Sequence, residues 1–375
     1  MPIPVLAAAA ASPSISDTEK LNEGVSVAMS AREGIYEQAR VLDVRSALID
    51  TGHGASQVKK YTVEIRSGIY SGKSRILTSD IANNPFQIDP RVGDKIIVYF
   101  VPDTNGGEPQ AYLESFDRRG AIYALIILFV LTLILLAGWQ GFKVAVSILA
   151  SVLIIGFVLI PAFLKGVNPV PIALILAGVL TGIASILSTA WNKKTVVTII
   201  GTVGGVLMAY VVGSAFSGWA HLSGLATDED RLFFTKNPLL NPQGLLFSGI
   251  IIASLGVVMD VAVSIASGIM EVQQANPKLG FKALFRSGMV VGRDHMAALA
   301  NTLVFAYVGG SLSTLLLYTQ YGGSWIKFLN FDGIVDEIIR SLSGTIGLTF
   351  TVPITALLGA WLMRGRTHRH LDRTS

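Results

Sequence analysis

The sequence predicts a membrane α-helical bundle of about seven transmembrane helices, preceded by a small extracytoplasmic β-rich domain similar to an OB-like or SH3-like barrel. Two observations lead to this fold class. Only 14% of the 375 residues are charged, against about 25% in soluble domains, and the mean hydropathy is +0.57. The apolar residues are also concentrated after residue 120. A purely water-soluble globule is therefore excluded.

Two segments precede the apolar part of the chain. Residues 1–35 are expected to be a leader or the remnant of a signal sequence. Their Ala-rich start, Met1–Ser12, is shorter than the ~20 residues that span a bilayer and lacks the basic beginning of a signal peptide. Residues 36–116 form the β-rich domain, because short β-branched and aromatic segments alternate with Gly, Pro and Asn. The expected strands are 39–44, 61–65, 74–78 and 95–101.

Residues 117–363 are the predicted transmembrane domain. Each apolar run is close to the length that a helix needs to cross about 30 Å of hydrocarbon. Helices are expected rather than strands, since backbone polar groups in lipid must be satisfied within the segment. The predicted spans are 121–138, 144–163, 169–189, 195–216, 244–270, 297–318 and 341–363.

Basic residues mark the ends of the predicted spans. Lys278, Lys282 and Arg286 recur every four residues and predict an amphipathic helix near 278–287 on the inner membrane surface. Residues 364–375 are a basic cytoplasmic tail. If the N-terminal domain lies outside, the inner loops hold more Lys and Arg than the outer loops, as the positive-inside rule requires.

Composition also limits the partners. The net charge is +4, but the basic residues follow the ends of apolar runs and are not interleaved with aromatic residues, so nucleic acid is excluded as a partner. The lipid bilayer is the expected partner, and the sequence is compatible with a homo-oligomer. The chain has no cysteine, which excludes disulfides and thiol chemistry.

The strongest candidate site is a polar stripe in the fifth predicted span. Asp260, Ser264, Ser267 and Glu271 are spaced so that they share one helix face. Asp260 falls well inside an apolar run, where an ionised carboxylate costs at least ~2.5–3.5 kcal/mol. Such a group must face water or protein, find a cation, or stay protonated. Asp260 is therefore a transport-path candidate, with a buried structural ion pair as the alternative. Glu271 is also a transport-path candidate, although its position fits an ordinary interfacial charge better.

A second polar group begins the next apolar segment. Arg293 and Asp294 are adjacent and cannot share a helix face, whereas Asp294 and Asn301 are seven residues apart and can. Since these charges flank the two polar-striped spans, we expect Arg293 or a bound cation to balance Asp260 or Asp294. All three residues are added to the transport-path candidates.

The predicted spans contain pairs of glycines, and the sequence lacks the common catalytic motifs. Gly178 with Gly182, and Gly201 with Gly205, lie four residues apart, which favours close helix packing over a hinge. The sequence contains no P-loop, GxGxxG, nucleophile elbow or HExxH motif, and no histidine has a second ligand at zinc spacing. We therefore expect no enzyme activity, no catalytic residue, no cofactor and no metal site.

Three strings carry a family resemblance: residues 256–267, 287–294 and 300–307. With them the chain resembles the YibE/F-like family of bacterial multi-pass membrane proteins over most of its length. The resemblance implies a location in the bacterial cell membrane and a permease-like protein. It also implies an additional hydrophobic signal or span at the N-terminus.

Two functions follow from the residues. The first is a permease or channel-like transporter of an ion or small solute, with Asp260 as the responsive group in a path between the fifth and sixth spans. The second is a non-transporting membrane receptor or scaffold whose outer β domain binds a partner or an envelope component.

Overall fold

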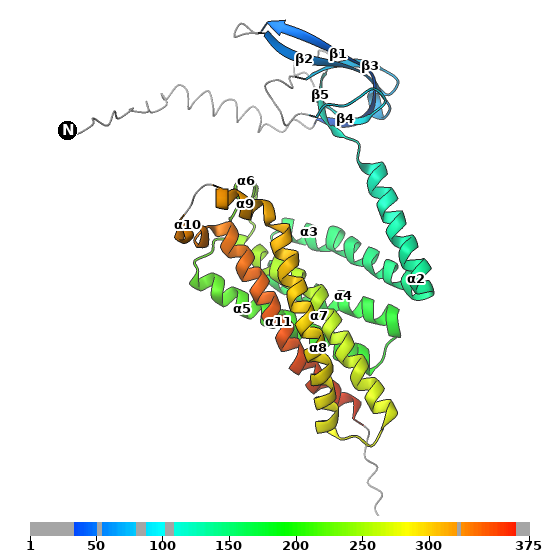
Figure 1. Ribbon diagram of the computed structural model, residues 1–375, viewed down its shortest axis with the longest axis vertical. Coiled ribbons are helices and arrows are strands. Elements are labelled where there is room, and N and C mark those ends of the chain that lie inside the picture. The colour runs from blue at the N-terminus through cyan, green and yellow to red at the C-terminus, as the bar shows by residue number, and fades with distance from the viewer. Residues whose placement is uncertain (1–33, 51–54, 80–87, 102–108, 321–323, 365–375) are drawn as a thin grey trace, which may run out of the picture. The chain divides into compact units, whose positions relative to one another are not determined.

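The computed structural model describes residues 34–50, 55–79, 88–101, 109–320 and 324–364 (Figure 1). The chain divides into two compact units, Met1–Leu128 and Phe129–Ser375. The predicted leader and most of the basic tail lie outside the described residues.

The first unit is a five-stranded antiparallel sheet with the strand order β3-β2-β1-β4-β5. The strands are β1 (Ile35–Asp50), β2 (Ala55–Ile65), β3 (Ser74–Ser79), β4 (Lys95–Val101) and β5 (Gln110–Phe116). The two edge strands, β3 and β5, contact each other, so the sheet curls. The predicted β-rich segment is confirmed, with a fifth strand that the apolar pattern did not indicate.

Alternation of side chains along the strands builds the core of the sheet. Val63 on β2 and Ile96 and Val98 on β4 are fully buried, together with Tyr61 and Phe100. A bulge between Val41 and Asp43 interrupts the pairing of β1 with β2, and bulges of this kind bend a strand and increase its twist. The bend in β1, the longest strand, therefore contributes to the curl of the sheet.

The second unit is helical. Its long helices are α2 (Arg119–Ile154), which begins in the first unit, α4 (Pro169–Thr189), α5 (Lys193–Trp219), α7 (Pro242–Ala275), α8 (Phe281–Gly310) and α11 (Asp332–Met363). The shorter ones are η2 (Ile155–Leu159, a π-helix), α3 (Ile160–Leu164), α6 (Asp228–Lys236), α9 (Leu312–Gln320) and α10 (Trp325–Leu329). In the first unit, η1 (Gly68–Tyr70) is a single 3-10 turn.

In the described part of the chain, five helical segments are long and apolar enough to cross a membrane, where the sequence predicts seven spans. One cause lies in the first two predicted spans, which form a single segment, Arg119–Leu164. This segment bends at Gly138, whose φ of 56° and ψ of −134° are not helical (Figure 1). Just beyond the bend, Gly141 lies against the carbonyl of Leu133, where a side chain would not fit.

The other cause is α8, which is not among these five segments. The sequence predicts an amphipathic helix near 278–287 and a separate span at 297–318, whereas α8 runs without a break from Phe281 to Gly310. Lys282 and Arg286 occupy its first turns, and Lys278 precedes it. Gly288 and Gly292 do not interrupt the helix, because both pack closely against neighbouring side chains.

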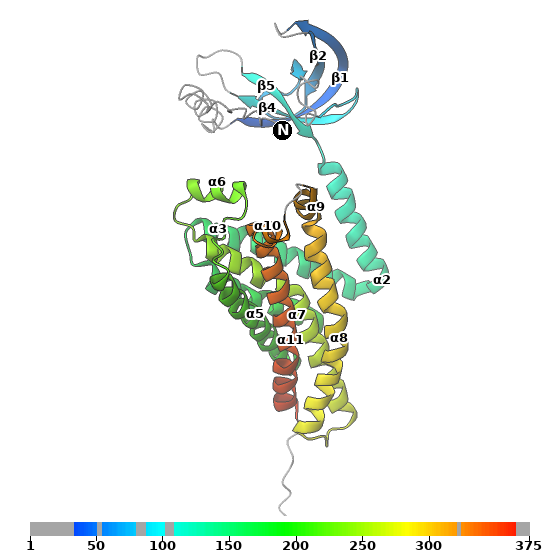
Figure 2. The same ribbon diagram turned by 60° about the vertical axis from the view of Figure 1, so that its left-hand side comes forward.

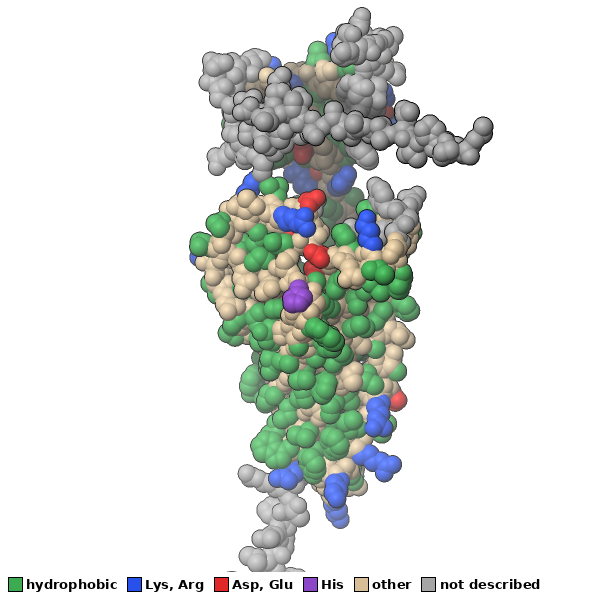
Figure 3. Space-filling view, turned by 90° about the vertical axis from the view of Figure 1, so that its left-hand side faces the viewer, with side chains coloured by type: hydrophobic (Ala, Val, Ile, Leu, Met, Phe, Trp, Pro, Cys, Tyr) green, Lys and Arg blue, Asp and Glu red, His purple; other side chains and the backbone are tan. Residues whose placement is uncertain are grey.

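Helices α5, α7 and α11 pack against one another at the centre of the bundle, with α4 and α8 beside them (Figure 2). Helices α6, α9 and α10 lie at one end of this unit, and the turn between α7 and α8 lies at the other. Acidic side chains gather at the α6 end, whereas the opposite end carries mostly Lys and Arg (Figure 3). We call these the acidic end and the basic end.

Candidate functional site

Asp260 lines a pocket of about 230 Å³ in the helical unit. The walls come from four helices that are distant in sequence: α2, α4, α5 and α7. Asp260 itself is an exposed residue of α7, and it faces away from the buried side formed by Val258, Val261 and Ala262. The polar residues around it in the pocket are Gln140, Lys143, Ser147, Ser185, Ser188, Lys194 and Thr198.

The pocket brings two positive charges close to this carboxylate. Lys143 comes from α2 and Lys194 from the first turn of α5. Within the described residues neither lysine forms an ion pair with Asp260, so the three groups face one space without neutralising each other by direct contact. Such a pocket can exchange a proton or attract a small charged solute.

Asp260 lies near the middle of α7, 15 residues before its last residue, Ala275. The pocket residues Ser188 and Lys194 flank the short turn that joins α4 to α5, so the pocket opens beside this turn. Helix α7 has 34 residues, which is about 50 Å at 1.5 Å per residue and exceeds the ~30 Å of hydrocarbon. An apolar run of this length does not show by itself which part of it lies at the centre of the bilayer.

The rest of the predicted stripe does not line this pocket. Ser264 and Ser267 are half-buried, and the Ser267 hydroxyl donates to the carbonyl of Val263 in its own helix at 2.8 Å. Glu271 is exposed, four residues before the end of α7. Of the four residues predicted to share one helix face, only Asp260 lines this pocket.

The polar residues of α8 lie on a different side of their helix from the contacts with α7 and α11. Those contacts are made through buried Leu284, Gly288 and Gly292. Arg293, Asp294 and Asn301 are exposed. Within the described residues, Arg293 and Asp294 form no ion pair, so the expected pairing of Arg293 with Asp260 or Asp294 is not formed. The basic residues that line the pocket with Asp260 are Lys143 and Lys194.

The four predicted packing glycines contact neighbouring helices. On α4, Gly178 and Gly182 face α5, where a Cβ would meet Val203 at 3.4 Å and Ile199 at 3.5 Å. On α5, Gly201 lies against Thr355 of α11, and Gly205 lies against Thr351. A Cβ at either α5 position would collide with a threonine side chain.

A second pocket, at the acidic end, was not found by sequence reasoning. It has a volume of about 840 Å³ and lies between α6, α9, the turn that follows α10 and the start of α11. Asp332, Asp336, Glu337 and Arg340 line it from α11. The predicted span began at residue 341, which left these residues in a loop, although the four-residue spacing of Asp336 and Arg340 is typical of one helix face.

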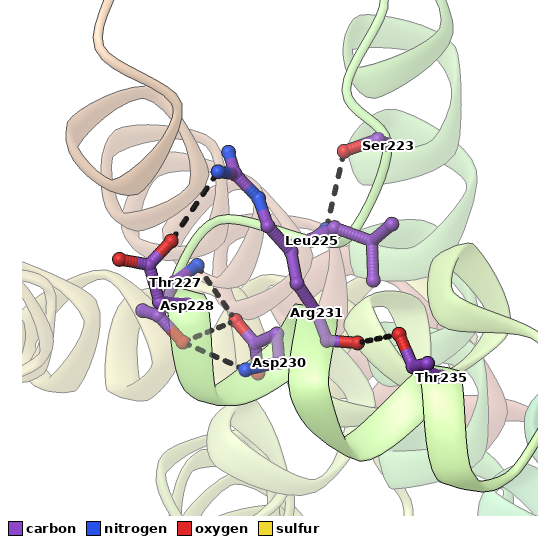
Figure 4. A network of polar contacts seen from close by, with 7 residues as sticks. All are labelled: Ser223, Leu225, Thr227, Asp228, Asp230, Arg231 and Thr235. Carbon is purple, nitrogen blue, oxygen red and sulfur yellow. Dashed lines mark hydrogen bonds and ion pairs between the residues drawn. The ribbon is translucent and has the colours of Figure 1, made fainter. Parts of the chain in front are cut away.

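The opposite wall of the second pocket is the start of α6, which is held by a local polar network (Figure 4). Thr227 and Asp230 cap the helix reciprocally, with the Asp230 backbone N–H donating to Thr227 Oγ1 at 3.1 Å. Arg231 donates to Asp228 at 3.3 Å. Two of the acids on this wall are therefore already occupied by contacts within the helix.

Comparison with known proteins gave one family. The family model described as YibE/F-like protein matches residues 125–365, which includes both pockets. No curated protein and no solved structure matched. Since the matched region covers more than half of the chain, the chain belongs to the YibE/F-like family. Its long apolar helices are consistent with a membrane location.

Proposed function

We propose that this protein is a permease or channel-like transporter of an ion or small solute and that it has no enzyme activity. The observation that carries this proposal is the pocket around Asp260, which opens among apolar helices and holds one acid and two lysines. Ionisable groups within membrane bundles are costly, and they mark ion and substrate pathways by default. Family membership supports a multi-pass membrane protein, and the transport role is our inference.

The pathway that we propose runs along α5 and α11 rather than between α7 and α8. The Asp260 pocket lies beside the turn between α4 and α5 and the second pocket lies at the acidic end, and α5 and α11 pack closely against each other. Hydroxyls on this seam support the route, because Thr198 and Thr202 on α5 and Thr355 on α11 are buried and have no hydrogen-bond partner within the described residues. Transport would require the two helices to separate along their glycine contacts.

The membrane orientation belongs to the same proposal. Lys278, Lys282, Arg286 and Arg364 lie toward the basic end, which we assign to the cytoplasm of a bacterial cell by the positive-inside rule. The N-terminal β unit would then lie outside. Seven crossings result if both arms of the segment bent at Gly138 cross and if α8 also crosses.

Ion flux into proteoliposomes tests the transport role. We expect the parent protein to carry protons or an alkali cation, as reported by trapped pH-sensitive and potassium-sensitive dyes, and Asp260→Asn to reduce the rate at least about tenfold. Glu271→Gln is the matched control, since this carboxylate lies on the same helix but outside the pocket. Flux that responds equally to both changes, or to neither, would contradict a role for the pocket.

A feature of the β unit favours the second candidate function, a receptor or scaffold. Tyr36, Tyr99 and Tyr112 lie directly opposite one another on the neighbouring strands β1, β4 and β5. Tyr36 is 59% exposed and Tyr112 is 50% exposed, and the rings of Tyr36 and Tyr99 lie 4.7 Å apart. Exposed aromatic groups are common at binding surfaces. Capture of an envelope component that is lost in Tyr36→Ala with Tyr112→Ala, in a protein without flux, would favour this function.

A further inference from the structure

We propose that the acidic end of the helical unit contains a binding site for a small organic ammonium ion with an apolar substituent. The site consists of the second pocket, which we call the acidic chamber, and an adjoining pocket, which we call the apolar annex. The inference deepens the proposed function by naming a class of substrate, and it rests on that function only for the claim that the bound ion is transported.

The acidic chamber has an excess of negative charge. Five acids line it, against two arginines. Arg231 is engaged with Asp228 at 3.3 Å, and Arg340 lies 3.8 Å from Glu337. Within the described residues, Asp332 and Asp336 have no ion-pair partner. A cation is therefore the favoured occupant.

Asp336 supplies the independent reason to expect a ligand. The residue is only 8% exposed, yet it lines the chamber. Its buried Oδ1 has no hydrogen-bond partner within the described residues. Leaving a buried charged acceptor unpaired is costly, and native structures pair nearly all such groups. An ammonium group would bring both the positive charge and the N–H donors that this oxygen lacks.

The apolar annex indicates what else the ligand carries. It has a volume of about 210 Å³ and shares Ser311, Thr314, Gly333 and Glu337 with the acidic chamber, so one molecule can occupy both. Its other walls are mostly apolar: Val304, Val308, Leu315, Phe328, Ile334, Ile338 and Leu342. An apolar cavity of about 150 Å³ binds benzene, so the annex is large enough for a phenyl group.

Two hydroxyls in the annex strengthen the argument for an occupant. Ser341 is 7% exposed and lines the annex, and neither its Oγ nor the Tyr307 hydroxyl has a hydrogen-bond partner within the described residues. A bare metal ion would leave the annex unused. The described residues also contain no group of three or more His, Cys, Asp or Glu side chains arranged to hold a metal. An organic cation explains both pockets.

Equilibrium binding to the full chain in nanodiscs tests this site without measuring transport. The probe is 2-phenylethylammonium, titrated by calorimetry, and its neutral analogue 2-phenylethanol and calcium chloride are titrated in parallel. We expect the ammonium to bind and 2-phenylethanol to bind at least about tenfold more weakly. Equal binding of the alcohol, or binding of calcium alone, would overturn the proposal.

Three variants assign the binding to the residues. Asp336→Asn should weaken 2-phenylethylammonium binding at least about tenfold, whereas Asp294→Asn should change it less than about threefold, since Asp294 is exposed and lines neither pocket. Val308→Phe should narrow the annex and weaken this probe, yet leave ethylammonium binding unchanged. Because Val308 is 44% exposed, this variant is expected to fold even if Asp336→Asn does not.

The outcomes separate this inference from the proposed function. Binding that depends on Asp336 and Val308, in a protein that shows no Asp260-dependent flux, would support the site and contradict transport. If flux depends on Asp260 but 2-phenylethylammonium binding is unchanged by substitution of Asp336 and of Val308, the result would support transport and contradict the proposed binding site.

Discussion

At the scale of single residues, the β unit depends on a glycine that places a buried acid. Gly68 has a φ of +64°, and a Cβ there would collide with the carboxylate of Glu37. Glu37 is only 5% exposed, and its carboxylate accepts a hydrogen bond from Ser67 Oγ at 2.5 Å. The positive φ and the close approach both require glycine at this position.

Gly68→Ala is therefore expected to lower the stability of the sheet. The left-handed backbone alone costs about 1–2 kcal/mol for a residue with a Cβ, and displacing Glu37 adds to this. Gly72→Ala is the matched control, because its φ is +81° but nothing lies within 4 Å of a Cβ. Hydrogen exchange of the β1 and β2 amides in the full chain measures both. Equal losses of protection would show that the contact with Glu37 has no effect.

A second residue-scale prediction concerns pH. Lys59 donates to Asp89 at 2.5 Å and Tyr61 donates at 2.8 Å, and these hydrogen bonds, led by that from Lys59, lower the pKa of the Asp89 carboxyl. A depressed carboxyl pKa stabilises the fold above the unfolded value of about 3.9, and this contribution is lost as pH falls through the folded pKa. Acid should therefore weaken the attachment of the 88–89 segment to β2.

The expected effect is small, because the Asp89 side chain is 49% exposed and exposed pairs contribute little. Hydrogen exchange of the β2 amides at pH 7 and at pH 3 should show a greater loss of protection in the parent than in Asp89→Asn, which lacks the titrating group. Lys59→Met should also lose less protection between pH 7 and pH 3 than the parent does, since it removes the leading cause of the lowered Asp89 pKa. The same loss of protection in all three proteins would exclude this contact as the source.

Of the residues in the Asp260 pocket, only some could be predicted from the sequence. Asp260 was identified from one unusual feature, a carboxylate in an apolar run. Its neighbours Lys143 and Lys194 were not, because each is an ordinary basic residue at the end of an apolar run, and only the packing of α2, α4, α5 and α7 brings them together. Arg293 was chosen instead because it flanks the two polar-striped spans, and such a position does not determine which face of a helix points at a neighbour.

At the scale of elements, α5 and α11 are joined by glycines on one helix and threonines on the other. Thr351 and Thr355 of α11 fill the spaces left by Gly205 and Gly201 of α5. Gly347 of α11 in turn lies against the backbone of α5 at Gly205. Such small-residue contacts let two backbones approach closely in a membrane, where van der Waals packing replaces the hydrophobic effect.

Gly205→Val should separate these two helices. The added side chain would meet Thr351 and Val258, and overpacking of this kind typically costs 1–3 kcal/mol. Gly218→Ala is the control within α5, because nothing lies within 4 Å of a Cβ there, and removing a helical glycine gains up to about 1 kcal/mol of helix propensity. Thermal unfolding in detergent compares the two, and a Gly205→Val protein as stable as Gly218→Ala would contradict the close contact.

The positions of the elements were more predictable than their ends. Apolar runs located the long helices, because the membrane requires both length and hydropathy. The bend at Gly138 was not predictable, since glycine is common in such helices and a non-helical φ and ψ leave no trace in the composition. The start of α11 at Asp332 was not predicted, because its first turns are polar and the prediction followed apolar runs. These turns line the acidic chamber.

At the scale of the whole molecule, the two ends of the helical unit differ in charge, and this difference determines how the unit should sit in a membrane. The acidic end holds Asp332, Asp336 and Glu337, and the basic end holds Lys278 and Lys282. Basic loops are retained in the cytoplasm, while acids contribute little to orientation. The basic end is therefore expected inside and the acidic chamber outside.

Cysteine labelling tests this orientation directly, because the chain has no cysteine of its own. Glu114→Cys in β5, Thr235→Cys in α6 and Gln274→Cys near the end of α7 all replace exposed residues. In intact cells, a membrane-impermeant maleimide should label positions 114 and 235, and it should label position 274 only after the membrane is permeabilised. Labelling of position 274 but not of position 235 in intact cells would show the opposite orientation of the bundle, with the acidic chamber facing the cytoplasm. Labelling of position 235 without position 114 would instead place the β unit inside, which requires an odd number of crossings before α6 in place of the even number that we propose.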